Sequence, residues 1–361
     1  MSWPTWLPLR DSLRPMSPYG APQVPARASL NTNENPNSPS PALQKAIADA
    51  VAQVASDLNR YPDRDATVLR TKLADYINEQ SGTKFSADNV WAANGSNEII
   101  QSIFLAFAQG PVLGFTPSYS MHPLIAKVTG SQWIDGKRNI DFSLNAAEAV
   151  SEIQKHKPTL TFITTPNNPT GGAVSIETIQ MLADAAKSVG GLLVVDEAYA
   201  EFSQEISAVT LISNSPHVVV IRTMSKAFAF AGARVGYLVS DVSVKDAMMI
   251  VRLPYHLSAL TQAAAQVAID HRAELLGGVS TLIKARAHVV QALHDMGLTT
   301  IPSSANFVLF TGFKQDAPQL WASMLEKGVL IRDVGLSGYL RVTIGNEAEN
   351  NLFISALKEL I

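Results

Sequence analysis

The sequence predicts an α/β protein with a mostly parallel, seven-stranded sheet in a large domain, followed by a smaller α+β domain. One observation is the length, because 361 residues exceed what a single hydrophobic core usually serves. The second is that short apolar runs alternate with amphipathic segments from residue 41 to about residue 260. This alternation is typical of parallel strands that are covered by helices on both faces.

The expected strands and helices are recognised by their apolar spacing. The strands are the apolar runs at 90–94, 110–115, 131–134, 160–165, 191–196, 217–222 and 234–239. Apolar residues recur at intervals of three and four, as in a helix, at 41–58, 96–109 and 175–189. Ligands of such sheets bind beyond the carboxyl ends of the strands, so polar residues that directly follow a run are candidates for function.

The pattern divides the chain into an arm and two domains. Residues 1–40 contain eight of the twenty prolines, which lack an amide donor, so we expect an extended N-terminal arm that reaches a partner subunit. Residues 41–260 form the predicted large domain. Residues 261–361 are rich in helical spacing and then contain short strands in ANFVLF, GVLIRD and YLRVTIG, which indicates the smaller domain.

Composition excludes several classes of function. The net charge of -3 gives no overall attraction to nucleic acid or to anionic membranes, so an anionic ligand must be bound locally. The absence of Cys excludes disulfides and a thiol nucleophile, and the seven His show no metal-binding spacing, so no metal is expected. Without a signal-peptide pattern or a long apolar run, we expect a soluble cytoplasmic protein.

Lys226 is the first candidate catalytic residue. It lies just past an apolar run in VVVIRTMSKAFAFAGARVGYLV, with the hydroxyls of Thr223 and Ser225 before it and Arg234 after it. Burial and nearby cations lower the pKa of a lysine and make the amine a nucleophile towards an aldehyde. In isolation, the motif is more typical of an ordinary surface lysine in a loop.

Two further strand ends carry polar residues. Asp196 ends the most apolar run and is followed by Tyr199. A buried carboxylate needs a cationic partner, which a protonated pyridine nitrogen would supply; the alternative is an Asp that caps the next helix. Asn168, in TFITTPNNPTGG, is placed to donate to a phenolate oxygen, although the motif also fits a simple turn.

A candidate phosphate site lies at the start of a helix. Ser96 and Asn97 open an amphipathic segment directly after a strand, in WAANGSNEIIQSIF. Helix starts present free amides and the positive end of the helix dipole, so a phosphate fits there without a net basic charge. The alternative is a helix cap by Ser96. Tyr119, in FTPSYSMHP, is either an aromatic residue of the site or a core residue.

Taken together, five motifs resemble a known family. SKAFAFAGARVGY, VVDEAYAEF, TPNNPTGG, NGSNEII and LNTNENP occur in the order found in the fold type I pyridoxal-phosphate-dependent aminotransferases. Within these enzymes the chain is most similar to the histidinol-phosphate aminotransferases. The resemblance extends over nearly the whole chain, and SKAFAFAGARVGY is its most specific part.

The resemblance implies roles around the ring of pyridoxal 5'-phosphate. Lys226 would form the internal aldimine and then move a proton between the substrate and the cofactor. Asp196 would pair with the pyridine nitrogen, while Asn168 and Tyr199 bond the ring hydroxyl. Tyr119 would stack on the ring, as suits a flat cationic ring.

The resemblance also implies a phosphate site and a substrate site. The cofactor phosphate would be held by Ser225, Arg234, Thr223 and the amides of Ser96 and Asn97.

For the substrate, Arg341 would hold the α-carboxylate and Arg332 the substrate phosphate, although either also fits a salt bridge at a strand end. Tyr19 and Asn35 would close the site. Tyr61, in a YPD segment that otherwise reads as a turn, would reach the cofactor phosphate of a partner, which implies a homodimer.

The predicted reaction transfers the amino group between L-histidinol phosphate and 2-oxoglutarate by a ping-pong mechanism in histidine biosynthesis, giving imidazole acetol phosphate and L-glutamate. An aromatic amino-acid (phenylalanine) aminotransferase is the alternative, and a phosphoamino-acid decarboxylase or lyase is a weaker one. The sequence departs from the family at His256 and in a short LSG loop. A dinucleotide-dependent oxidoreductase lacks support because no GxGxxG follows the first strand, and a non-catalytic binder would not need a base or paired arginines.

Overall fold

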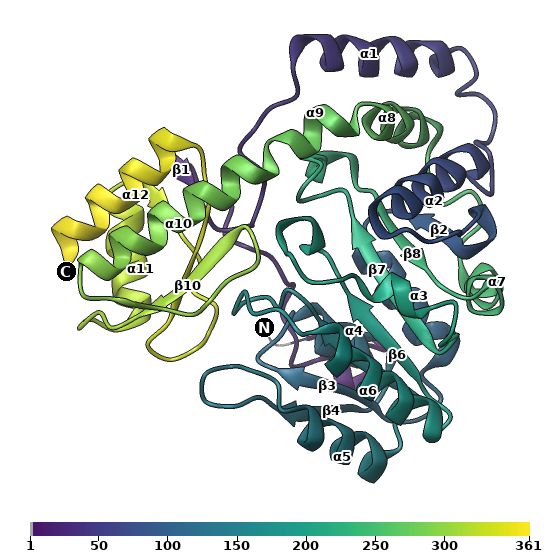
Figure 1. Ribbon diagram of the computed structural model, residues 1–361, viewed down its shortest axis with the longest axis horizontal. Helices are drawn as coiled ribbons and strands as arrows, with labels where there is room; N and C mark the ends of the chain where they lie inside the picture. The colour runs from purple at the N-terminus through teal and green to yellow at the C-terminus, as the bar shows by residue number, and fades with distance from the viewer. Residues whose placement is uncertain (1–2) are drawn as a thin grey trace.

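The computed structural model describes residues 3–361, and its large domain is built on a seven-stranded sheet (Figure 1). The strand order is β2-β8-β7-β6-β5-β3-β4, so every predicted strand of the large domain is confirmed. The strands are β2 (Val90–Ala93), β3 (Val112–Thr116), β4 (Trp133–Lys137), β5 (Leu160–Thr164), β6 (Leu192–Asp196), β7 (Val218–Thr223) and β8 (Gly236–Val239).

Only β8 departs from the parallel arrangement. It runs antiparallel to both of its neighbours, β2 and β7, whereas β7, β6, β5, β3 and β4 are parallel. The carboxyl ends of the parallel strands therefore meet at one edge of the sheet, and the start of β8 lies at the same edge.

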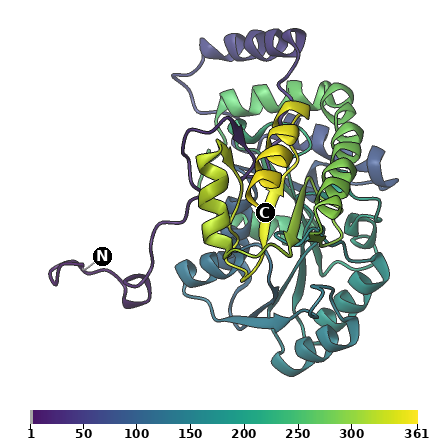
Figure 2. The ribbon, with the colours of Figure 1, turned by 90° about the vertical axis from the view of Figure 1, so that its left-hand side faces the viewer.

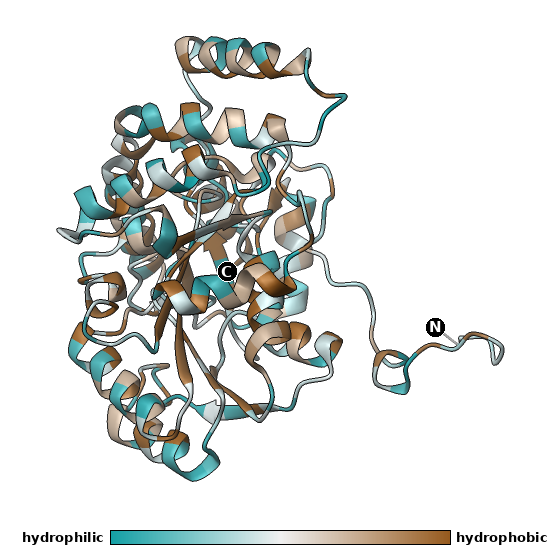
Figure 3. Ribbon diagram, turned by 90° about the vertical axis from the view of Figure 1, so that its right-hand side faces the viewer, coloured by the Kyte–Doolittle hydropathy of each residue, from teal (hydrophilic) through white to brown (hydrophobic). Residues whose placement is uncertain are grey.

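Helices cover both faces of this sheet, as the apolar strands require. One face packs against α3 (Ser96–Phe107), α4 (Met121–Thr129) and α7 (Val242–Val251). The other packs against α2 (Thr67–Ser81), α5 (Ala146–His156), α6 (Ile176–Ser188) and α8 (Ala259–Asp270). Figure 3 shows the apolar strands enclosed by helices with mixed surfaces. Within residues 3–361, no helix is both long and apolar enough to cross a membrane.

The small domain has its own core. Its antiparallel sheet has the order β12-β10-β9, with β12 (Leu340–Thr343), β10 (Phe307–Thr311) and β9 (Thr299–Thr300). The helices α10 (Val279–Asp295), α11 (Ala317–Glu326) and α12 (Glu347–Leu360) pack on it.

The connection between the domains is helical. The short α9 (Arg272–Gly277) joins α8 to α10. Leu275 belongs to the core of the large domain and Val279 to that of the small domain, so the packing changes between these residues. The predicted boundary after residue 260 falls in the first turn of α8, which packs with the large domain.

The N-terminal arm is extended but not wholly separate. Figure 2 shows it leaving one side of the body, with only a short 3-10 helix, η1 (Asp11–Leu13), and Trp6 is 78% exposed. Further along, β1 (Ala28–Ser29) pairs in parallel with β11 (Val329–Leu330), and its Ala28 is buried in the small-domain core. The arm thus ends as a strand of the small domain.

Helix α1 (Pro41–Ala55) lies apart from the sheet, alongside α8 (Figure 1). Ser40 caps it by accepting from the amide of Leu43, and Pro41 occupies its first position, where no amide donor is needed. Of its fifteen residues only Leu43 is buried.

A buried ion cluster ties the ends of β6 and β7 together. The guanidinium of Arg222 donates to Glu197 at 2.8 Å and to Glu201 at 3.1 Å, and all three side chains are buried. Glu197 directly follows Asp196, and Arg222 directly precedes Thr223. Because the cluster links the residues next to them, it fixes the relative positions of Asp196 and Thr223, two candidate site residues.

We predict that Arg222→Ala lowers the free energy of unfolding by about 3–5 kcal/mol, because two carboxylates would remain buried without a cation. Urea unfolding followed by circular dichroism measures this. Lys45→Ala is the control, since Lys45 forms an exposed pair with Asp49, and it should cost at most about 1 kcal/mol. Equal effects of the two substitutions would contradict the structural role of the cluster.

Candidate active site

A cavity of about 600 Å³ lies at the edge where the strands of the large-domain sheet end, and it is bounded by the arm and the small domain. Of the predicted site residues, the following line it: Tyr19, Ser96, Asn97, Tyr119, Asn168, Asp196, Tyr199, Thr223, Ser225, Lys226, Arg234, Arg332 and Arg341. Residues from distant parts of the sequence are thus brought together. Among the described residues, no cluster of three or more His, Asp or Glu could hold a metal ion.

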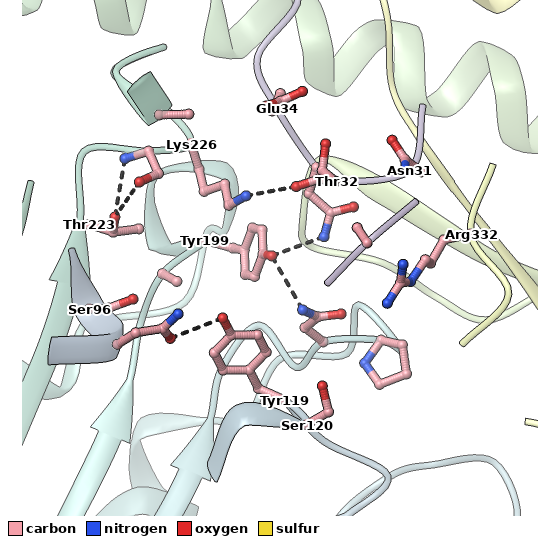
Figure 4. Close-up of a pocket in the computed structure, with 18 of the residues that line it drawn as sticks. Asn31, Thr32, Glu34, Ser96, Tyr119, Ser120, Tyr199, Thr223, Lys226 and Arg332 are labelled. Carbon is pink, nitrogen blue, oxygen red and sulfur yellow. Dashed lines mark hydrogen bonds between the residues drawn. The ribbon is translucent and has the colours of Figure 1, made fainter. Parts of the chain in front are cut away.

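Lys226 presents its amine to this cavity from the loop after β7. Its Nζ donates to the carbonyl of Thr32 at 2.9 Å and lies 5.9 Å from the ring centre of Tyr199 (Figure 4). Burial, followed by the charges of Arg341 and Arg234, lowers the pKa of Lys226 to about 8, although Glu34 opposes this. The amine is therefore readily available as a neutral nucleophile.

Asp196 is held by two neighbours at the end of β6. Its Oδ1 accepts from the amide of Ala198 at 3.2 Å. Its Oδ2 lies 3.2 Å from Nε2 of His122, a residue that is only 1% exposed and belongs to the first turn of α4. An ionised carboxylate only accepts, so His122 donates and fixes the orientation of Asp196.

Nothing in the spacing of the seven histidines distinguishes His122 from the others. The available signal was its position three residues after Tyr119 at the start of a helix, which brings both side chains to one end of that helix. Their rings meet edge to face, with 5.5 Å between centres.

Tyr199 is surrounded by amide groups. Its hydroxyl accepts from Asn33 Nδ2 at 2.9 Å and lies 3.5 Å from Asn168 Nδ2. Burial raises the pKa of Tyr199, so the phenol stays protonated and can act as a donor. Asn33, which lies two residues before the predicted Asn35, was not identified from the sequence.

An anion site lies at the start of α3. The amides of Ser96 and Asn97 are in the first helical turn and line the cavity, so the positive end of the helix dipole is directed towards a bound anion. The hydroxyls of Thr223 and Ser225 lie 3.0 Å apart beside it, and Arg234 adds a cation. These groups suit a phosphate.

Two glycines make this anion site possible. Gly95 has φ +83°, and a Cβ there would meet Nη2 of Arg234 at 2.6 Å. A Cβ on Gly236 would meet the amide nitrogen of Ser96 at 2.4 Å. Only glycine at both positions lets the helix start, β8 and Arg234 approach this closely.

The opposite side of the cavity carries two arginines. Arg341 and Arg332 exchange backbone hydrogen bonds of 2.9 Å as an antiparallel bridge, so their side chains project from the same face. Arg341 donates to the carbonyl of Asn31 at 2.7 Å and to Oδ1 of Asn168. Its buried Nε has no partner among the described residues, which leaves a donor for an anionic substrate group.

Some of the residues singled out in the sequence lie elsewhere. Asn35 donates to the carbonyl of Ala227 at 3.2 Å and does not line the cavity. Tyr61 is 79% exposed and stacks on Tyr255, with ring centres 4.3 Å apart. His256 packs near Trp91 and bonds the carbonyl of Ala92, away from the cavity.

The residues present fit pyridoxal 5'-phosphate. The anion site of Ser96, Thr223, Ser225 and Arg234 would hold its phosphate. Asp196 would face the pyridine nitrogen, Asn168 and Tyr199 would donate to the ring oxygen, and the amine of Lys226 would meet the aldehyde. Such an arrangement defines a lysine-anchored, pyridoxal-phosphate-dependent transferase as the class of protein.

Comparison with known proteins narrows this class. The model of the family described as aminotransferase class I and II matches residues 28–357, so the chain belongs to that family. The histidinol-phosphate aminotransferase of Mycolicibacterium vanbaalenii is 55% identical over 97% of this chain and 95% of its own length. The enzyme of the same name from Mycolicibacterium smegmatis is 52% identical over 98% of this chain and 93% of its own.

The fold is also similar to that of a solved structure. The histidinol-phosphate aminotransferase of Sinorhizobium meliloti in complex with pyridoxal-5'-phosphate has a TM-score of 0.81 at 25% identity, covering 93% of this chain and 91% of that one. The predicted fold class and family are therefore confirmed.

We predict that the apoprotein condenses with pyridoxal phosphate at a rate that rises with pH around a midpoint near 8, because only the neutral amine of Lys226 attacks the aldehyde. Stopped-flow absorbance of the yellow product measures the rate. Lys226→Ala should fold normally but give no such product. A midpoint near 10.5, the ordinary value for lysine, would contradict the assigned effect of burial.

Proposed function

We propose that this chain is a pyridoxal-phosphate-dependent transaminase that moves the amino group between L-histidinol phosphate and 2-oxoglutarate. The observation that carries the proposal is that one cavity contains a depressed-pKa lysine, a buried carboxylate and two convergent arginines. Relatives that are 52–55% identical over nearly the full length and are named histidinol-phosphate aminotransferases support it.

Each residue has a distinct task in this reaction. Bound pyridoxal phosphate supplies an electron-withdrawing ring that stabilises negative charge at the substrate carbon. Asp196, oriented by His122, holds a proton on the pyridine nitrogen. With the cofactor bound, the amine of Lys226 would act as the base that takes the proton from the substrate α-carbon and delivers it to C4' of the cofactor.

The two arginines explain how one site accepts different substrates. Histidinol phosphate has a phosphate and no carboxylate, whereas glutamate has two carboxylates. A guanidinium binds either group with two parallel hydrogen bonds, so Arg332 and Arg341 can serve both half-reactions. Arg341 already lies beside Asn168, and it can therefore position the substrate next to the ring oxygen.

We further propose that the enzyme works as a homodimer. Tyr61 does not line the cavity of its own chain, and it stacks on Tyr255. Leu58, Ile250 and Leu253, which are close to these two tyrosines in the sequence, are likewise exposed apolar side chains. A second copy that covers these side chains would receive Tyr61 at its own cofactor phosphate. The predicted cytoplasmic location stays a prediction.

We predict that Arg332→Leu lowers kcat/KM for histidinol phosphate about ten- to a hundredfold, because a charge-assisted hydrogen bond worth about 1.5–3 kcal/mol is lost. Steady-state assays with 2-oxoglutarate as acceptor measure this, and phenylalanine, which has no phosphate, is the control donor. If the unsubstituted enzyme prefers phenylalanine by kcat/KM, the proposed substrate is wrong and the aromatic aminotransferase is favoured.

We predict that two inactive variants restore activity when they are mixed. Tyr61→Ala would damage the partner's site and Lys226→Ala its own, so a hybrid dimer of the two variants contains one intact site. Assays after mixing and subunit exchange test this, with each variant alone as the control. Absence of recovery in confirmed hybrid dimers would show that Tyr61 does not act across the interface.

A further inference from the structure

The hydroxyl of Tyr199 is bonded in an unusual way for a buried phenol. Both of its side-chain contacts are with amide nitrogens, of Asn33 at 2.9 Å and of Asn168 at 3.5 Å. A phenol oxygen accepts two hydrogen bonds and donates one. No acceptor for its own proton is found among the described residues, so the proton is left for the cavity that Tyr199 lines.

The proton of Tyr199 is left for the cavity only if Nδ2 of Asn33 faces the phenol, and Thr343 fixes this orientation of the amide. The backbone N–H of Asn33 donates to Oγ1 of Thr343 at 3.0 Å, so that oxygen is an acceptor there. The hydroxyl proton of Thr343 has no other acceptor among the described residues, so it goes to Oδ1 of Asn33, also at 3.0 Å; a turned amide would leave this buried proton without a partner. With Oδ1 occupied by Thr343, the Nδ2 of Asn33 must face Tyr199.

The surroundings hold Asn33 in this position. It is 1% exposed, and Thr343 is 2% exposed, so water does not compete for these bonds. The backbone of Asn33 has φ +56°, a region that Asn tolerates better than most residues, and its carbonyl accepts from Asn306 Nδ2 at 3.1 Å. All four polar groups of Asn33 are therefore engaged.

We propose that Asn33 and Thr343 are positioning residues that direct the O–H proton of Tyr199 into the cavity, towards the ring oxygen of the bound cofactor. The inference rests on the proposed function and deepens it. A fixed donor stabilises negative charge on that oxygen, which lowers the pH at which the visible absorption band of the bound cofactor changes. Thr343 lies two residues after Arg341 in β12. The strand that carries the substrate-binding arginine therefore also determines the direction in which the Tyr199 hydroxyl donates its proton.

Thr343→Val tests the inference. Valine neither donates nor accepts, so the Asn33 amide can turn and offer Oδ1 to the proton of Tyr199. We expect the pH midpoint of the cofactor's visible band to rise by about 0.5–1 unit. Thr343→Ser keeps the hydroxyl and should retain the wild-type midpoint, while melting temperatures report any purely structural effect.

An unchanged midpoint in folded Thr343→Val would overturn the inference. Neutron diffraction on the wild-type protein, with or without cofactor, provides a test that needs no variant. We expect both deuterons on Nδ2 of Asn33 and the Tyr199 deuteron directed into the cavity; a Tyr199 deuteron directed at Asn33 would refute the inference. Failure of the proposed function has a different signature, namely a wild-type protein that shows no cofactor band or does not use histidinol phosphate.

Discussion

The chemistry of this site depends on the burial of one amine. Lys226 lies in a cavity whose walls carry Arg234 and Arg341, and both the desolvation and the neighbouring positive charge favour its neutral form. A neutral amine can attack an aldehyde and can also accept a proton. One physical constraint therefore prepares the same nitrogen for anchoring a cofactor and for acting as a base.

The fold satisfies this constraint at the edge where its parallel strands end. Burying a carboxylate and an amine within one cavity is costly unless every polar group is oriented, and the strand ends supply rigid attachment points. Asp196 is held by His122 and Ala198. The ion pair of Glu197 and Arg222 links the ends of β6 and β7 next to it. The rigid scaffold thus keeps the charged side chains in positions that they would otherwise leave.

The sequence predicted the elements and motifs that depend on local pattern. The strands of the large domain follow from apolar runs; Asp196 ends one such run, and Asn168 and Lys226 come a few residues after two others. Asn33 was missed because NTNENP offers several similar side chains, and the choice among them depends on a left-handed backbone and on Thr343, which is 310 residues away. The antiparallel direction of β8 and the role of His122 likewise depend on tertiary contacts that no local pattern encodes.

The long-range contacts also explain why the site needs both domains. Tyr199 and Ala227 come from the large-domain sheet region, yet they pack in the same core as Phe307 and Val342 of the small domain. The arm residues Asn31 to Asn33 lie between them and bond to Arg341, Tyr199 and Thr343. A displacement of β12 would therefore alter the substrate arginine and the environment of Tyr199 together. The substrate-binding side and the cofactor-binding side are consequently parts of one hydrogen-bonded unit, although the arm, the strand ends of the large domain and β12 are far apart in the sequence.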